Sequence, residues 1–77
     1  MLTAPQLFDV LIKHGERHGP DCPVLVIDRG SDPQPTDMTV STLKMVPDGS
    51  IPWQEQWCRV VSTSVGPSNE MILTLAG

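Results

Sequence analysis

The first twenty residues carry the hydrophobic pattern of an amphipathic helix. Thr3 and Gln6 have the spacing of a capping box, in which each side chain bonds an amide of the first turn. Apolar or small residues then recur at helical spacing on one face, and polar residues occupy the other. The first set is Leu7, Phe8, Leu11, Gly15 and His18, and the second is Gln6, Asp9, Lys13 and Glu16. Because Gly19-Pro20 ends this pattern, we predict a helix over about residues 4–17.

Four later segments have the composition of β-strands. Residues 24–27 are apolar on both faces, which suits a strand that is covered on both sides. Residues 38–46 predict a second strand with a bulge near Ser41-Thr42, where the alternation changes phase. Residues 56–65 and 70–75 alternate as half-buried strands do. In the last strand the inward side chains are expected to be Met71, Leu73 and Leu75.

Proline, glycine and asparagine mark the connections between these segments. We predict a loop over residues 29–37, a turn over 47–50 and a four-residue hairpin loop over 66–69. The element order is then α-β-β-β-β. It predicts an α+β fold in two layers: one N-terminal helix packed on a four-stranded, mainly antiparallel sheet arranged as a meander. A chain of 77 residues allows one domain, over residues 1–77.

Composition limits the classes of function. Nine acidic residues against five Lys and Arg give a net charge of −4, which argues against binding to DNA or RNA. The longest apolar run has four residues, too few for a membrane span. The N-terminus lacks the pattern of a signal peptide, so we expect a cytoplasmic protein. A chain this short builds a small core, and we therefore expect a homo-oligomer.

The two tryptophans are candidate binding residues. Trp53 and Trp57 are two of the three aromatic residues and flank a short polar segment after Ile51-Pro52. Tryptophan is a favoured anchor for a protein partner, and it also stacks on nucleobases. Alternatively the rings fill the core, which the position of Trp57 within a strand favours more than that of Trp53. We take both tryptophans and Ile51 as candidate contacts.

The arginines suggest a site for an anion. Arg29 and Arg59, with Arg17 and Lys44, would bind a phosphate if the loops brought them together, because guanidinium groups bind phosphate with two hydrogen bonds. A nucleotide needs few such groups and one stacking ring. The alternative is that these cations are scattered over the solvated surface.

Two histidines and two cysteines raise the question of a metal. His14, His18 and Cys22 follow one another at intervals of four, and with Cys58 they would complete a tetrahedral zinc site. However, Gly19-Pro20 ends the helix before Cys22, and zinc cysteines usually come in close pairs. We therefore expect no cofactor and keep zinc as the alternative. In the other interpretation the cysteines are small buried apolar residues.

Nothing in the chain orients a catalytic group. His14 or His18 with Cys22 would form a thiol–imidazole pair, but no third residue positions the histidine and no oxyanion hole is visible. Asp28, Asp32 and Asp37 lie in a proline-containing segment that resembles an ordinary polar loop. We expect a protein that binds rather than an enzyme.

The N-terminal part resembles a known group of sequences. Residues 2–28, with the capped helix and then His18-Gly19-Pro20-Asp21-Cys22-Pro23-Val24, are similar to small accessory proteins of phages and prophages. The resemblance implies an accessory protein of the host cytosol, in a class that includes inhibitors and decoys of host defence. It carries over no functional residue. We expect a binding protein that inhibits or modulates a host macromolecule, or alternatively an oligomeric sponge for a nucleotide-type signal, or a structural component of an assembly.

Overall fold

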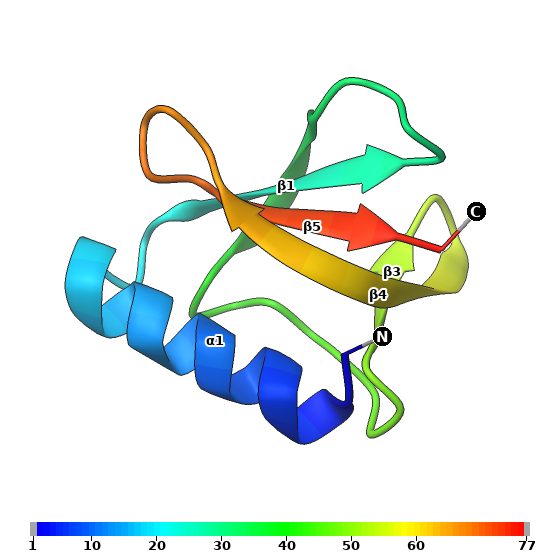
Figure 1. Cartoon of the computed structure of the whole chain (residues 1–77), viewed down its shortest axis with the longest axis horizontal. Helices are drawn as coiled ribbons and strands as arrows, with labels where there is room; N and C mark the ends of the chain where they lie inside the picture. Colours follow the sequence, from blue (N-terminus) through cyan, green and yellow to red (C-terminus); the bar gives the residue numbers. More distant parts are fainter. Residues whose placement is uncertain (1, 77) are drawn as a thin grey trace.

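The computed structural model describes residues 2–76, so both terminal residues of the predicted domain lie outside it. An N-terminal helix is followed by a strongly curled half-barrel of strands, and Figure 1 shows the helix lying along one side of this sheet. The α+β class is confirmed. The elements are α1 (Ala4–His18), β1 (Pro23–Asp28), β2 (Gln34–Thr39), β3 (Ser50–Trp53), β4 (Gln56–Val65) and β5 (Met71–Leu75).

The predicted helix and its cap are confirmed. The Thr3 amide donates to Gln6 Oε1 at 2.9 Å, and the Gln6 amide donates to Thr3 Oγ1 at 3.3 Å, which completes the capping box. The buried face differs from the predicted one, however, because it consists of Leu7, Leu11 and His14. Phe8, predicted on the packed face, is 54% exposed. The helix is therefore rotated so that the aromatic ring lies beside the core instead of in it.

The predicted meander is wrong. Over residues 2–76 the sheet has five strands in the order β2-β1-β5-β4-β3, and β1 runs parallel to β5. The other neighbours are antiparallel, so the sheet is mixed. The chain leaves β1, forms β2 at one edge, crosses to β3 at the opposite edge and returns to the centre with β5. Long-range pairing of β1 with β5 therefore replaces the local pairing that a meander needs.

Two strands lie where the sequence predicted other structure. β2 occupies the end of the predicted 29–37 loop and only the first two residues of the predicted 38–46 strand. Residues 40–42 form a turn and residues 43–46 are irregular, so the predicted strand and its bulge near Ser41-Thr42 are absent. β3 adds a strand at Ser50–Trp53, before the predicted 56–65 strand. The 56–65 strand itself matches β4.

A β-bulge in β4 lets the sheet curl around its core. The register between β4 and β5 shifts between Val60 and Ser62, which reverses the alternation along the strand. Val60 therefore faces the core before the shift, and Thr63 pairs with Leu73 after it. The inward positions predicted for β5 are confirmed. The core cluster consists of Leu7, Leu11, Val24, Val26, Ile51, Val60, Met71, Leu73 and Leu75.

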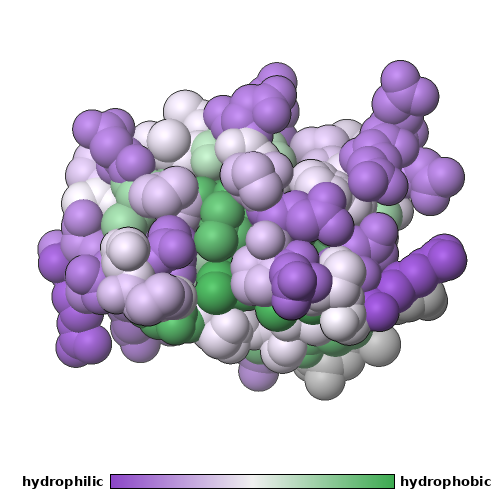
Figure 2. Space-filling model, turned by 90° about the horizontal axis from the view of Figure 1, so that it is seen from above, coloured by the Kyte–Doolittle hydropathy of each residue, from purple (hydrophilic) through white to green (hydrophobic). Residues whose placement is uncertain are grey.

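The face of the sheet that points away from α1 is mixed in character. Leu25 of β1 pairs with Ile72 of β5, and serine and threonine side chains of β4 and β5 lie beside them. Figure 2 looks onto this side and shows a narrow apolar strip between hydrophilic side chains. No helix within residues 2–76 is long and apolar enough to cross a membrane.

Candidate binding site: the tryptophan–arginine hollow

Four of the predicted binding residues lie around one hollow of about 430 Å³. It forms at the end of the molecule where β1 and β5 finish and where the β3–β4 hairpin turns, next to the C-terminus in Figure 1. We call it the tryptophan–arginine hollow. Its lining residues are Asp28, Arg29, Trp53, Gln54, Gln56, Trp57, Cys58, Arg59 and Ala76. Segments that are distant in the sequence thus contribute two tryptophans and two arginines to one hollow, although the pairing of Trp53 with Gln56 and of Pro52 with Trp57 places the two indole rings on opposite faces of the β3–β4 hairpin.

The two tryptophans have different roles in this hollow. Trp53 packs against the core, and its Nε1 donates to Asp28 Oδ2 at 3.4 Å, which joins the hairpin to the end of β1. Trp57 is 58% exposed, although its strand position favoured the core. The expected order of burial is therefore reversed. Trp53 forms part of the wall, and Trp57 offers its indole to solvent.

Arg29 approaches the hollow from a tight turn at the end of β1. The Ser31 amide donates to the Asp28 carbonyl at 3.1 Å, and Arg29 and Gly30 between them have φ values of 55° and 76°. These angles are those of a type I′ turn, which favours asparagine and glycine. An arginine in this conformation costs about 1 kcal/mol relative to glycine.

Arg59 reaches the hollow from the opposite side, on β4. Its carbonyl accepts from the Ala76 amide at 2.9 Å, which holds the end of the chain beside the hollow. The Arg59 side chain also acts on Asp48. Hydrogen bonding from Ser50 and then the positive charge of Arg59 lower the pKa of Asp48 below its ordinary value of 3.8. The Ser50 amide donates to Asp48 Oδ1 at 3.0 Å.

Backbone strain is concentrated around this site. Among residues 2–76, four non-glycine residues have positive φ, and three of them are Arg29, Gln54 and Glu55. Gln54 and Glu55 form the two-residue turn between β3 and β4, at φ 52° and 66°. The fourth is Asn69, a residue type that tolerates this region. Arg29, Gln54 and Glu55 all lie in two-residue turns, in which a positive φ is the usual geometry.

Comparisons of the chain with protein-family models, with curated proteins and with solved structures give no match.

The remaining predicted contacts lie elsewhere. Ile51 is fully buried in the core and offers no surface to a ligand. Arg17 lies in the last turn of α1, and Lys44 lies near the N-terminal half of the helix. The hollow is thus lined by two of the four predicted cations, Arg29 and Arg59, whereas Lys44 borders a different pocket beside Trp53 and Gln54.

The four alternative zinc ligands do not form a common site. The His14 and His18 rings lie side by side, with centroids 4.8 Å apart. Cys22 Sγ donates to the carbonyls of Asn69 and His18, at 3.3 and 3.7 Å. Cys58 lies at the tryptophan–arginine hollow instead, with its thiol 4.0 Å from the Trp53 carbonyl. Within the described chain no group of three or more His, Cys, Asp or Glu side chains is arranged to hold a metal. Both cysteines are free thiols.

Sequence reasoning missed the polar part of the hollow. The sequence predicts that Asp28 belongs to an ordinary polar loop. In the structure its carboxylate accepts the hydrogen bond from Trp53 Nε1. Gln54 and Gln56 line the hollow because the hairpin turns at Gln54-Glu55, a pair without the usual turn signal. The signal that was present is the proximity of Trp53 and Trp57 in the sequence, since the two residues lie on the two strands of the hairpin.

Proposed function

We propose that this chain is a non-enzymatic binding protein that inhibits or modulates a macromolecular partner, and that the tryptophan–arginine hollow is its contact surface. The observation that carries the proposal is the exposed indole of Trp57 beside two arginines in one hollow. Tryptophan and arginine are the residues that most often dominate protein–protein binding energy. Trp57 is the anchor, and Arg29 and Arg59 supply directional hydrogen bonds around it.

Charge favours a protein partner over a phosphate-bearing one. The Asp28 carboxylate lines the same hollow as the two guanidinium groups, and Glu55 lies in the adjoining turn. The whole chain carries a net charge of −4. A phosphate at this site would therefore face nearby negative charge, whereas a protein surface of mixed charge would pair with both signs.

The resemblance of residues 2–28 to phage accessory proteins suggests which partner to look for. It would place the partner among the macromolecules of a bacterial host, with components of host defence as the first candidates. The hollow itself specifies only the chemistry of the contact: an apolar pocket or aromatic side chain that receives Trp57, with carboxylates at the rim for the arginines.

The test compares three immobilised chains in a lysate of the bacterial host. The wild-type chain and a Val65→Ala control should retain the same partner in stoichiometric amount, and Trp57→Ala should lose it. Val65 is a matched control because it is 55% exposed and lies at the far end of β4. Retention of the same partner by Trp57→Ala, or retention of no protein by the wild type, would contradict the proposal.

A second candidate function is the sequestration of a nucleotide-type ligand, because one exposed tryptophan, Trp57, and two arginines line one hollow. Its volume of about 430 Å³ is within the range of small-molecule sites. The test is thermal unfolding with AMP, ADP, cyclic AMP and inorganic phosphate. A ligand at a hundredfold excess over its Kd should raise Tm by roughly 10–20 °C, and Trp57→Ala should abolish the shift. The protein-partner proposal predicts no shift with any of these ligands.

A further inference from the structure

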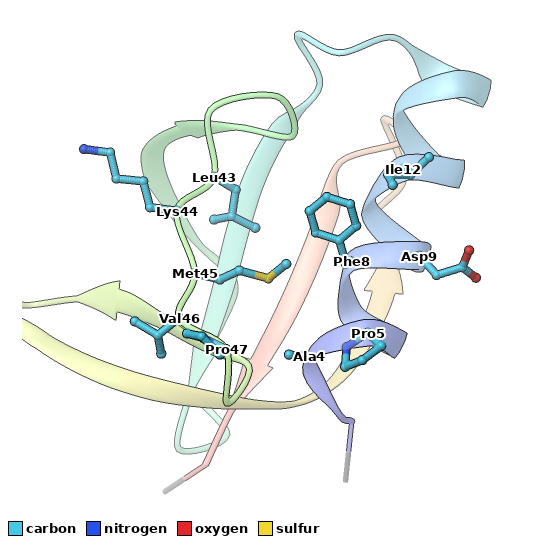
Figure 3. A pocket seen from close by; sticks show the side chains of 10 residues that line it. All are labelled: Ala4, Pro5, Phe8, Asp9, Ile12, Leu43, Lys44, Met45, Val46 and Pro47. Atoms are coloured by element: carbon cyan, nitrogen blue, oxygen red, sulfur yellow. The ribbon is translucent and has the colours of Figure 1, made fainter.

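A second, apolar surface lies between α1 and the segment that follows β2. The helix wall carries Phe8 and Ile12, which are 54% and 47% exposed, and the opposite wall carries Leu43, Met45 and Val46. We call this surface the helix groove. Figure 3 shows the Phe8 ring and the Met45 side chain directed toward one another across it. A volume of about 940 Å³ makes it larger than the tryptophan–arginine hollow.

Hydrogen bonds hold both ends of the second wall, so the groove exists before anything binds. At one end the Val40 amide donates to the Cys22 carbonyl at 3.0 Å. At the other end the Val46 amide donates to the Ser50 carbonyl at 3.0 Å, and Gly49 approaches the backbone of Ala4. A Cβ at Gly49 would lie 3.6 Å from the Ala4 nitrogen. A preformed surface loses little conformational entropy on association.

The groove has walls of opposite charge. It runs beside the ridge formed by α1, so a two-fold axis would place the ridge of each copy in the groove of the other. Acidic residues of the helix, Asp9 and Glu16, flank one wall, and Lys44 flanks the other. The same axis brings the acidic side of one copy to the basic side of its partner. Asp9 already pairs with Lys13 at 2.9 Å, but both are exposed, so this pair is weak and can be exchanged.

The edges of the sheet are poorer sites for self-association. β2 and β3 form the two edges, and each contains a proline, Pro35 and Pro52 respectively. Proline has no amide to donate to an added strand, and natural proteins use it to block pairing between edges. The apolar helix groove is therefore the better candidate for the contact between copies.

We infer that the helix groove is the interface of a two-fold symmetric homodimer, in which Phe8 of each copy inserts against Leu43 and Met45 of the other. A stable interface covers about 800 Å² of each partner. This area is about one sixth of the 4761 Å² accessible surface of the chain. The interface therefore has to include both the exposed side of α1 and residues 40–47. The inference is independent of the proposed function, because the groove and the hollow share no lining residue.

Sedimentation equilibrium of the full chain tests the interface. The wild type should have twice the mass of 8.4 kDa at micromolar to millimolar concentration. Phe8→Glu buries two charges in the symmetric interface and should raise the dimer Kd at least about 100-fold. Val65→Glu introduces the same charge at an equally exposed site on β4 and should leave the Kd unchanged. Equal weakening by the two variants, or a wild type that stays at 8.4 kDa, would overturn the inference.

Charge reversal identifies the occupant as a second copy. Asp9→Lys or Lys44→Asp alone should weaken the dimer about tenfold, because each change places like charges together twice across the two-fold axis. The double variant restores both pairs and should recover the wild-type Kd. If the double variant is as weak as the singles, the proposed pairing is wrong. If the wild type is a monomer and an apolar dye binds in its groove, the groove binds a different protein and the homodimer inference is wrong.

Discussion

The two tryptophans of the β3–β4 hairpin differ at the level of single residues in what they contribute. Trp53 packs against the core and donates to Asp28, whereas Trp57 is 58% exposed. Burial predicts that Trp53 stabilises the fold, and exposure predicts that Trp57 is available for binding. Burial could not be read from the sequence, because the local pattern of β4 places Trp57 in a half-buried strand without showing that its face is the open one.

Replacing each tryptophan by alanine should therefore have different effects. Trp53→Ala should lower the free energy of unfolding by about 2 kcal/mol, through lost packing and an unpaired Asp28 carboxylate. Trp57→Ala should change it by less than about 0.5 kcal/mol, as surface substitutions do. Urea denaturation measures both values. Equal losses of stability would show that Trp57 is a structural residue.

Asp48 gives a prediction for pH. Its pKa is lowered in the folded state by hydrogen bonds from Ser50 and by the charge of Arg59. The carboxylate therefore stabilises the fold above the ordinary pKa of 3.8, and this contribution is lost as the pH falls through the lowered folded-state pKa. Asp48→Ala should lower the urea midpoint at pH 7, and this effect should become smaller as the pH falls below 3.8. Asp32→Ala controls for the removed charge, and a pH-independent effect of Asp48→Ala would contradict the assignment.

At the level of elements, the sequence predicted those with strong local signals. The capping box indicated α1, a continuous apolar run indicated β1, and apolar alternation indicated β4 and β5. β2 and β3 were missed because each contains a proline and β2 is largely polar, as edge strands often are. The parallel pairing of β1 with β5 was also missed, since no local pattern shows which distant strands become neighbours. The exposure of Phe8 depends on the rotation of α1, which tertiary packing decides.

The turn between β3 and β4 allows a test of strain at the level of an element. Glu55 has φ 66°, a conformation that favours glycine. Glu55→Gly should therefore stabilise the fold by about 0.5–1 kcal/mol, measured by urea denaturation. Glu55→Ala removes the same carboxylate without relieving the backbone, so it should give no gain. An equal gain from both variants would attribute the effect to charge rather than strain.

At the level of the whole molecule, the small curled sheet presents two separate surfaces. The tryptophan–arginine hollow lies where β1, β5 and the β3–β4 hairpin meet, and the helix groove lies between α1 and residues 40–47. The first is polar with one exposed indole, and the second is apolar. The rare residue types of the tryptophan–arginine hollow, tryptophan and arginine, made most of that surface predictable from the sequence. The helix groove was not predicted, because it depends on the path of the irregular segment 43–46.

The affinity of the captured partner for three variants tests the central claim most directly. Trp57→Ala should weaken its Kd at least about 30-fold relative to the wild type, as loss of a dominant anchor does. Val65→Ala and Phe8→Glu should each stay within about twofold of the wild type, because neither residue lines the hollow. A Trp57→Ala chain that binds the partner with wild-type affinity would contradict the assignment of the tryptophan–arginine hollow as the binding site.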